Sequence, residues 1–233
     1  MSVTTRWIEI GAGGEERYDG YLALPRAGKG PGVIIVQEIF GVNAHIRSVA
    51  EQYALAGYVA LAPDIFWRGE RRVELGYEGA DRDKALALLK AVDVEKTVSD
   101  LGGAAATLRA QPETAGKIGA VGFCFGGQLA YLMAARGTVD AAVAYYGGGI
   151  QNKLNEAANI RVPVMFHYAE HDGSIPQTAV AQVKQSFAGR SDVQFFDYPG
   201  AAHGFNCPDR SAYDQHASAL AHGRTLSFLA SVL

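Results

Sequence analysis

The sequence predicts an α/β protein with a mainly parallel sheet that is covered by helices on both faces. Short apolar, β-branched segments alternate along the chain with longer segments of helix-forming composition, an order that is typical of repeated strand–helix–strand units. In addition, residues 121–127 (Val-Gly-Phe-Cys-Phe-Gly-Gly) lie between one such strand and one such helix. Their spacing of glycines around a central cysteine indicates a sharp turn that exposes a nucleophile.

The chain begins with two strand-like segments, residues 6–10 and 17–24, around a glycine cluster at 11–14. This spacing favours an antiparallel hairpin or a pair of edge strands. The cluster lacks the third glycine of a dinucleotide-binding fingerprint and is followed by two glutamates, so we interpret it as a turn.

The segments that follow continue the alternation as far as the sharp turn. Residues 32–36 are apolar and β-branched, as in strands that are buried on both faces of a parallel sheet. Residues 67–81 are polar and glycine-rich, and we interpret them as an excursion near the functional site. The remaining elements expected here are a helix at 44–56 that ends at Gly57, a strand at 58–62, helices at 81–91 and 94–108, and a strand at 117–121.

Beyond the turn, the same alternation predicts helices and strands to the end of the chain. They are a helix at 127–135, strands at 141–146, 162–167 and 193–198, and helices at 177–187 and 214–233. No repeat, low-complexity tract or linker separates these segments. We therefore expect one domain over residues 1–233.

Composition excludes several classes of function. The 233 residues are 48% hydrophobic with a net charge of -3 and no basic run, so we expect no nucleic-acid partner. No apolar stretch reaches the roughly 18 residues of a membrane span, so we expect no membrane partner. Two cysteines without a visible signal peptide predict free thiols in the cytoplasm. We expect a monomer, with a dimer as the alternative.

Cys124 is the candidate nucleophile. Gly122 and Gly126 flank it, as a tight strand–turn–helix requires. A cysteine at a helix N-terminus is favoured as a thiolate by the helix dipole. The alternative is a structural cysteine, because free cysteine is among the most buried residue types.

Four loops that follow predicted strands carry Cys124 and the other candidate catalytic residues. Ligands bind at the carboxyl ends of strands in open parallel sheets, and these loops hold Glu38, Cys124, Asp172 and His203. The order of nucleophile, acid and histidine is that of the α/β-hydrolases. In this arrangement the histidine takes the thiol proton, and the aspartate orients the imidazole. The alternatives are a turn dipeptide for Asp172 and a solvated loop acid for Glu38.

The remaining groups of the predicted site are backbone amides. The N–H groups of Phe125 and Ile39 are the expected oxyanion hole. His167 and His171 are four residues apart but span the end of a strand, so we expect no metal site, and the chemistry needs no cofactor.

These residues match a known family. The chain resembles the dienelactone hydrolases (carboxymethylenebutenolidases), cysteine-dependent α/β-hydrolases of aromatic-compound degradation. The resemblance covers nearly the whole chain and is carried by residues 37–43, 62–64, 122–127, 145–147, 171–172 and 203–205. It implies that Cys124, Asp172 and His203 form the triad. It also implies that Glu38 lies close to the thiol and takes part in its activation.

The family reaction opens an enol-lactone through a thioester acyl-enzyme and gives a ring-opened acid such as maleylacetate. A carboxylesterase or thioesterase with another natural substrate is the alternative. A further alternative is a catalytically silent binding protein, which the complete triad disfavours.

The substrate contacts depart from the family pattern. By the resemblance, two arginines bind the substrate carboxylate. Arg82 matches one of them, and the alternative is that it is only a solvated charge at a helix end. Cys207 occupies the position of the other arginine. Leu86 replaces an aromatic residue of the same wall. Phe40 and Tyr145, which lie in the matching segments, are also expected to contact the substrate. A clamp with one arginine is weaker, so we expect neutral esters to be handled comparatively well.

Overall fold

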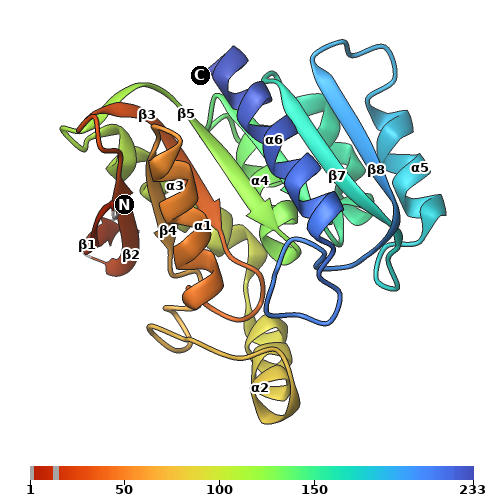
Figure 1. The fold of residues 1–233 in the computed structure, drawn as a ribbon, viewed down its shortest axis with the longest axis horizontal. Coiled ribbons are helices and arrows are strands. Elements are labelled where there is room, and N and C mark those ends of the chain that lie inside the picture. Colours follow the sequence, from red (N-terminus) through yellow and green to blue (C-terminus); the bar gives the residue numbers. More distant parts are fainter. Residues whose placement is uncertain (1–2, 13–15) are drawn as a thin grey trace. The chain divides into compact units, whose positions relative to one another are not determined.

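The computed structural model describes residues 3–12 and 16–233. The chain divides into two compact units, Met1–Ala120 and Val121–Leu233, and the boundary between them falls inside strand β5, Thr114–Phe123 (Figure 1). The expectation of one domain over the whole chain stays a prediction. Among the described residues, no helix has the length and apolar character to span a lipid bilayer.

In the first unit, strands β1, β2, β4 and β3 lie side by side in this order. The β1–β2 and β2–β4 pairs are antiparallel, and β3 and β4 are parallel. The expected antiparallel pair at the start of the chain is present, while Gly13 and Gly14 of its turn lie outside the described residues. The elements are β1 Thr4–Gly11, β2 Arg17–Leu24, β3 Gly30–Val36, α1 Ala44–Leu55, β4 Val59–Pro63, α2 Gly79–Ala91 and α3 Val94–Arg109.

The sequence explains the main elements of this unit. The β-branched residues of β3 are fully buried, as expected for a strand that is covered on both faces. Helix α1 packs against β2, β3 and β4, and α3 packs against β1, β3 and β4. Both helices begin at side-chain caps: Asn43 accepts from the N–H of Ile46, and Asp93 accepts from the N–H of Lys96.

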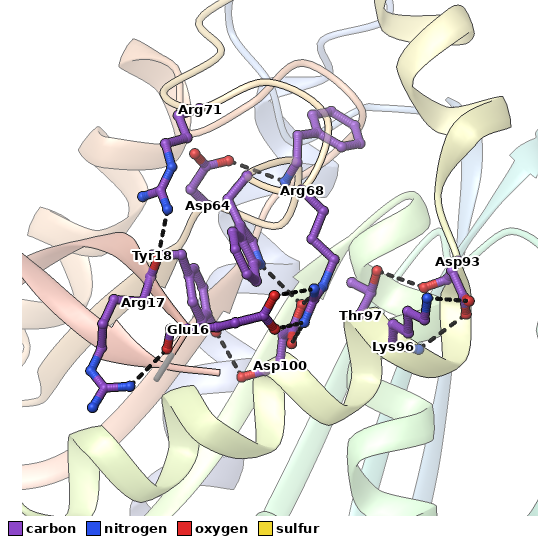
Figure 2. A network of polar contacts seen from close by, with 12 residues as sticks. Glu16, Arg17, Tyr18, Asp64, Arg68, Arg71, Asp93, Lys96, Thr97 and Asp100 are labelled. Atoms are coloured by element: carbon purple, nitrogen blue, oxygen red, sulfur yellow. Dashed lines mark hydrogen bonds and ion pairs between the residues drawn. The ribbon is translucent and has the colours of Figure 1, made fainter. Parts of the chain in front are cut away.

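A polar network around Asp100 ties the loop after β4 to α3 and β2 (Figure 2). The Asp100 carboxylate accepts from Arg68 Nε and Nη2, both at 2.9 Å, and from Trp67 Nε1 at 3.0 Å. The hydroxyl of Tyr18 donates to the Asp100 carbonyl at 2.7 Å, and Arg68 also pairs with Glu16. Because Asp100 is only 4% exposed, these donors compensate the cost of burying its charge.

In the second unit, the last residues of β5 are followed by β6, β7 and β8 in sheet order. The β6–β7 and β7–β8 pairs are parallel. Helix α4 packs on β6, and α6 packs on β6, β7 and β8. The elements are α4 Phe125–Ala135, β6 Ala141–Tyr145, the 3₁₀ helix η1 Ile150–Asn159, β7 Val164–His171, α5 Gln177–Ser186, β8 Val193–Ala202 and α6 Gln215–Val232.

The second unit differs from the sequence prediction in two ways. Strands β7 and β8 extend beyond their predicted ends, because pairing resumes after a bulge with His171 opposite Ala202. Asp172 and His203 therefore follow directly on paired strand residues. The helix η1, which is kinked at Lys153, was not predicted from the sequence.

Candidate active site

Cys124 lies at a strained turn between β5 and α4. Its backbone has φ 55° and ψ −117°, outside the regions that most residues adopt. A side chain at Gly122 would collide with the backbone carbonyl of Gly126 and come within 2.9 Å of the nitrogen of Gly127. The expected sharp turn is therefore present, and Gly122 is the residue that lets the two arms of the turn approach.

The backbone of the turn is held by the end of β6. The N–H of Cys124 donates to the carbonyl of Tyr145 at 3.0 Å, and the N–H of Gly127 donates to the carbonyl of Cys124 at 3.0 Å. Phe125 is the first residue of α4, where N–H groups have no acceptor within the helix. The structure thus places at the helix N-terminus the Phe125 N–H that sequence analysis assigned to the oxyanion hole.

Asp172 and His203 form a buried, hydrogen-bonded pair. His203 Nδ1 lies 2.7 Å from Asp172 Oδ2, and the Asp172 side chain is only 1% exposed. The other carboxylate oxygen accepts from the N–H groups of Ser174 at 2.8 Å and Ile175 at 3.1 Å. These bonds fix the carboxylate, so it holds the imidazole in one orientation.

His203 also hydrogen-bonds to Cys124. Burial by itself lowers the pKa of His203. Hydrogen bonds to Asp172 and Cys124, with the negative charges of both, outweigh burial and raise the pKa from 6.5 to about 10. At neutral pH the imidazole is therefore a cation between a carboxylate and a sulfur atom.

Tyr146 supports this histidine and was missed by sequence analysis. Its ring centroid lies 5.1 Å from that of His203 and 5.2 Å from that of Phe205. Its backbone has φ 36°, an unusual value for a bulky residue, and its N–H donates to the carbonyl of His167 at 2.7 Å. Sequence analysis used residues 145–147 only as part of the family match and gave Tyr146 no role, because an aromatic residue after a strand is common.

Comparison with known proteins assigns the family. A sequence model described as the dienelactone hydrolase family matches residues 18–233. The chain belongs to the dienelactone hydrolase family. It is 36% identical over 221 residues to the carboxymethylenebutenolidase of Pseudomonas putida, a match that covers 92% of this chain and 94% of that protein.

Two further dienelactone hydrolase comparisons agree. The chain is 34% identical over 224 residues to carboxymethylenebutenolidase 1 of Cupriavidus pinatubonensis (strain JMP 134 / LMG 1197), covering 96% of this chain and 95% of that protein. A crystal structure from Klebsiella pneumoniae subsp. pneumoniae MGH 78578 is 29% identical, with a TM-score of 0.84 over 97% of this chain and 99% of that chain. The protein is thus a hydrolase of the dienelactone hydrolase type, with the predicted α/β-hydrolase fold.

Two of the expected substrate contacts are buried in the second unit. The Tyr145 side chain is 1% exposed, and its hydroxyl lies 2.7 Å from Thr225 Oγ1 of α6. Cys207 is fully buried. The roles of Tyr145 and Cys207 as substrate contacts stay predictions. The arginine that the family pattern has at position 207 would here take the place of a completely enclosed thiol.

The remaining candidate residues belong to the first unit. Glu38 is 1% exposed, Ile39 is 9% exposed and Phe40 is 5% exposed, all in the loop between β3 and α1. The Phe40 ring packs edge-on against Tyr77 with centroids 4.6 Å apart. Arg82 is exposed in the first turn of α2. Glu38 is therefore no solvated loop acid, although its catalytic role, like those of Ile39, Phe40 and Arg82, stays a prediction.

A second histidine of the unit, His167, is part of the core. It is completely buried, with Nδ1 2.7 Å from the Tyr198 hydroxyl and Nε2 3.0 Å from Thr225 Oγ1. Burial, and then the charge of Arg224, lower its pKa from 6.5 to about 3. His167 is thus neutral and structural. Within the described residues, no cluster of three or more histidine, cysteine or acidic side chains is placed to hold a metal ion.

Proposed function

We propose that this hydrolase opens an enol-lactone such as dienelactone, or cleaves a related ester, through a thioester on Cys124. The observation that carries the proposal is the single histidine, His203, bonded on one side to a fixed carboxylate and on the other to the thiol of the strained turn. This is the arrangement that nucleophilic catalysis by a triad requires. The family relatives named as carboxymethylenebutenolidases support the lactone as the substrate class.

The hydrogen bond between His203 and Cys124 supports an ion pair as the starting state of the first step. We propose that the attacking group is the Cys124 thiolate, with the proton held on His203. The sulfur bonds to the lactone carbonyl carbon, the ring C–O bond breaks, and the leaving enolate takes the proton from His203. An enol is a good leaving group, so a thiolate is a sufficient nucleophile.

The second step regenerates the enzyme. The now neutral His203 takes a proton from water, the hydroxide attacks the thioester carbon, and the C–S bond breaks to restore the thiolate and release the acid. The N–H of Phe125, with that of Ile39, is proposed to bind the carbonyl oxygen as it becomes negative. Buried Glu38 is proposed to modulate formation of the thiolate. These steps consume only water and substrate, so the proposal includes no metal or cofactor.

Trapping the acyl-enzyme tests the proposal. The protein is mixed in turn with dienelactone, a short activated ester and a thioester, and the intact mass is followed while peptide mapping locates the adduct. We expect an acyl adduct on Cys124 and multiple turnovers with the lactone. Cys124→Ala should lose the adduct and several orders of magnitude in rate. Cys207→Ala, a change at the other cysteine of the sequence, is the matched control and should keep the adduct.

Each other outcome contradicts part of the proposal. Acylation and turnover by the thioester or the ester, with none by dienelactone, would assign a different natural substrate to the same machinery. Binding of dienelactone without an adduct or turnover would indicate a silent binding protein. An adduct on Cys207 alone would remove Cys124 as the nucleophile.

A further inference from the structure

A groove of about 530 Å³ is lined by residues of helix α6 and of strands β7 and β8, against which this helix packs (Figure 1). Its apolar surface comes from Met165, Phe196, Leu220 and Phe228. Leu220 is 40% exposed although its side chain is large and apolar. The volume lies within the range of sites that bind small organic molecules.

The groove begins at the strand ends opposite to the catalytic candidates. Met165 and Gln194, which both line it, are the second residues of β7 and β8. Asp172 and His203 follow the last residues of the same two strands. Seven residues of extended strand span roughly 20 Å, so a ligand at Met165 lies far from the acid of the predicted triad.

Arg224 gives this apolar groove a positive charge. Its Cζ atom lies 4.3 Å from the ring centroid of Phe196 and 5.3 Å from that of Tyr198, and it hydrogen-bonds to Tyr198. Stacking uses the flat face of a guanidinium and leaves the N–H donors at its edge available. With five such donors, Arg224 retains the capacity to bind a further acceptor.

The acidic residues in and beside β8 are paired with other cations. Asp197 forms an ion pair with Lys184, and Asp192 forms one with Arg190. Over residues 3–12 and 16–233, no acidic side chain forms an ion pair with Arg224. The groove therefore combines an apolar surface with a positive charge that no carboxylate of the described chain pairs with.

We propose that this groove binds an aromatic carboxylate, with the carboxylate on Arg224. The guanidinium donates in a fork that matches a carboxylate. The rings of Phe196 and Phe228 and the thioether of Met165 suit a flat apolar body, because aromatic and sulfur–aromatic contacts add to the burial of area. Binding here does not depend on the proposed reaction, because neither Cys124 nor its partners line the groove.

Methionine methyl groups labelled with carbon-13 report on the groove directly. The chain has three methionines; Met165 lines the groove, and Met133 is buried in α4 and serves as the internal reference. The probes are 2-naphthoate and its neutral analogue 2-naphthamide. We expect 2-naphthoate to shift the Met165 resonance to saturation without moving that of Met133, and 2-naphthamide to bind more weakly. Cys124→Ala should bind 2-naphthoate as the wild type does.

Variants of the groove measure the part played by the charge. Arg224→Gln should raise Kd for 2-naphthoate by about 10- to 100-fold and change Kd for 2-naphthamide by less than about threefold. Arg224→Lys should fall between wild type and Arg224→Gln, because it keeps the charge but loses the fork. Ser227→Trp, at an exposed position that lines the groove, should fill it and abolish binding of both probes. Arg161→Gln, at an exposed arginine outside the groove, is the control and should bind normally.

The other outcomes overturn the proposal. Equal Kd values for acid and amide, or unchanged binding of 2-naphthoate by Arg224→Gln, would show that the charge does not select a carboxylate. Binding that persists in Ser227→Trp, or equal shifts of Met133 and Met165, would place the ligand elsewhere. A wild-type dimer that Ser227→Trp converts to a monomer in sedimentation would assign the groove to a second copy of the chain. If Arg224→Gln unfolds, Arg224→Lys and Ser227→Trp still decide the question.

Discussion

Replacing Asp172 by asparagine tests how the site sets the charge of His203. The amide oxygen can still accept from the N–H groups of Ser174 and Ile175, as Asp172 Oδ1 does. The amide nitrogen then faces His203 Nδ1 with hydrogens, so it repels the doubly protonated imidazole and favours the neutral ring with a lone pair at Nδ1. The neutral ring no longer forms the ion pair with the Cys124 thiolate that the proposed first step requires. We therefore expect a folded protein with little activity.

The magnitude follows from the contact that is lost. The pKa of His203 lies at about 10 instead of 6.5, a difference that corresponds to about 3 to 5 kcal/mol. A hydrogen bond to a charged group contributes about 1.5 to 3 kcal/mol, so loss of this bond alone should lower the His203 pKa by about one to two units, and loss of the Asp172 charge should lower it further. Because the folded pKa is raised, the stabilisation is complete below pH 6.5 and is lost as the pH rises through 10. At pH 6 the variant should unfold more easily by about 2 kcal/mol.

Two measurements check the prediction. The imidazole Cε1–H resonance of His203 should titrate at lower pH in the variant, and kcat/KM for an activated ester should fall by about 10³ to 10⁴. Asp197→Asn, which removes a carboxylate paired with Lys184 in the same unit, is the control and should alter neither. If His203 still titrates near pH 10 in Asp172→Asn, or if activity stays within tenfold of wild type, the aspartate does not set the charge of the histidine.

Three further changes probe other parts of the chain. Gly122→Ala should destabilise the protein by about 3 kcal/mol or more, because the new methyl group meets backbone in the turn; a melting temperature within 2 °C of wild type would contradict this. Asp100→Asn should cost about 2 to 4 kcal/mol in urea unfolding, since Arg68 loses its buried partner; equal stability would show that the network adds nothing. Glu38→Gln should alter the pH dependence of Cys124 alkylation by iodoacetamide, and an unchanged curve would exclude an effect on the thiol.

The sequence was informative where local chemistry decides the structure. The two glycines around Cys124 and the alternation of strands and helices led to the turn, the mainly parallel sheet and the family. Asp172 and His203 were found through their order along the chain, which the fold then converts into a contact of 2.7 Å.

The structural features that the sequence did not predict depend on contacts between distant segments of the chain. The extension of β8 to Ala202 comes from pairing with β7 across a bulge, which no local period reveals. The Tyr146 ring, which follows β6, meets His203, which follows β8, past the end of the intervening strand β7. The burial of Glu38, too, is a property of the folded chain that its local sequence does not indicate.

The buried His167 sets a limit to acid tolerance. Its pKa in the fold is about 3, while the exposed imidazole of an unfolded chain binds a proton below pH 6.5. Each step of acidification between these values therefore favours unfolding. His203 has the opposite dependence, since its contribution fades between pH 6.5 and 10. Of these two histidines, the one in the core thus governs acid unfolding and the one beside Cys124 governs alkaline unfolding, so their joint contribution to stability is largest near pH 6.5.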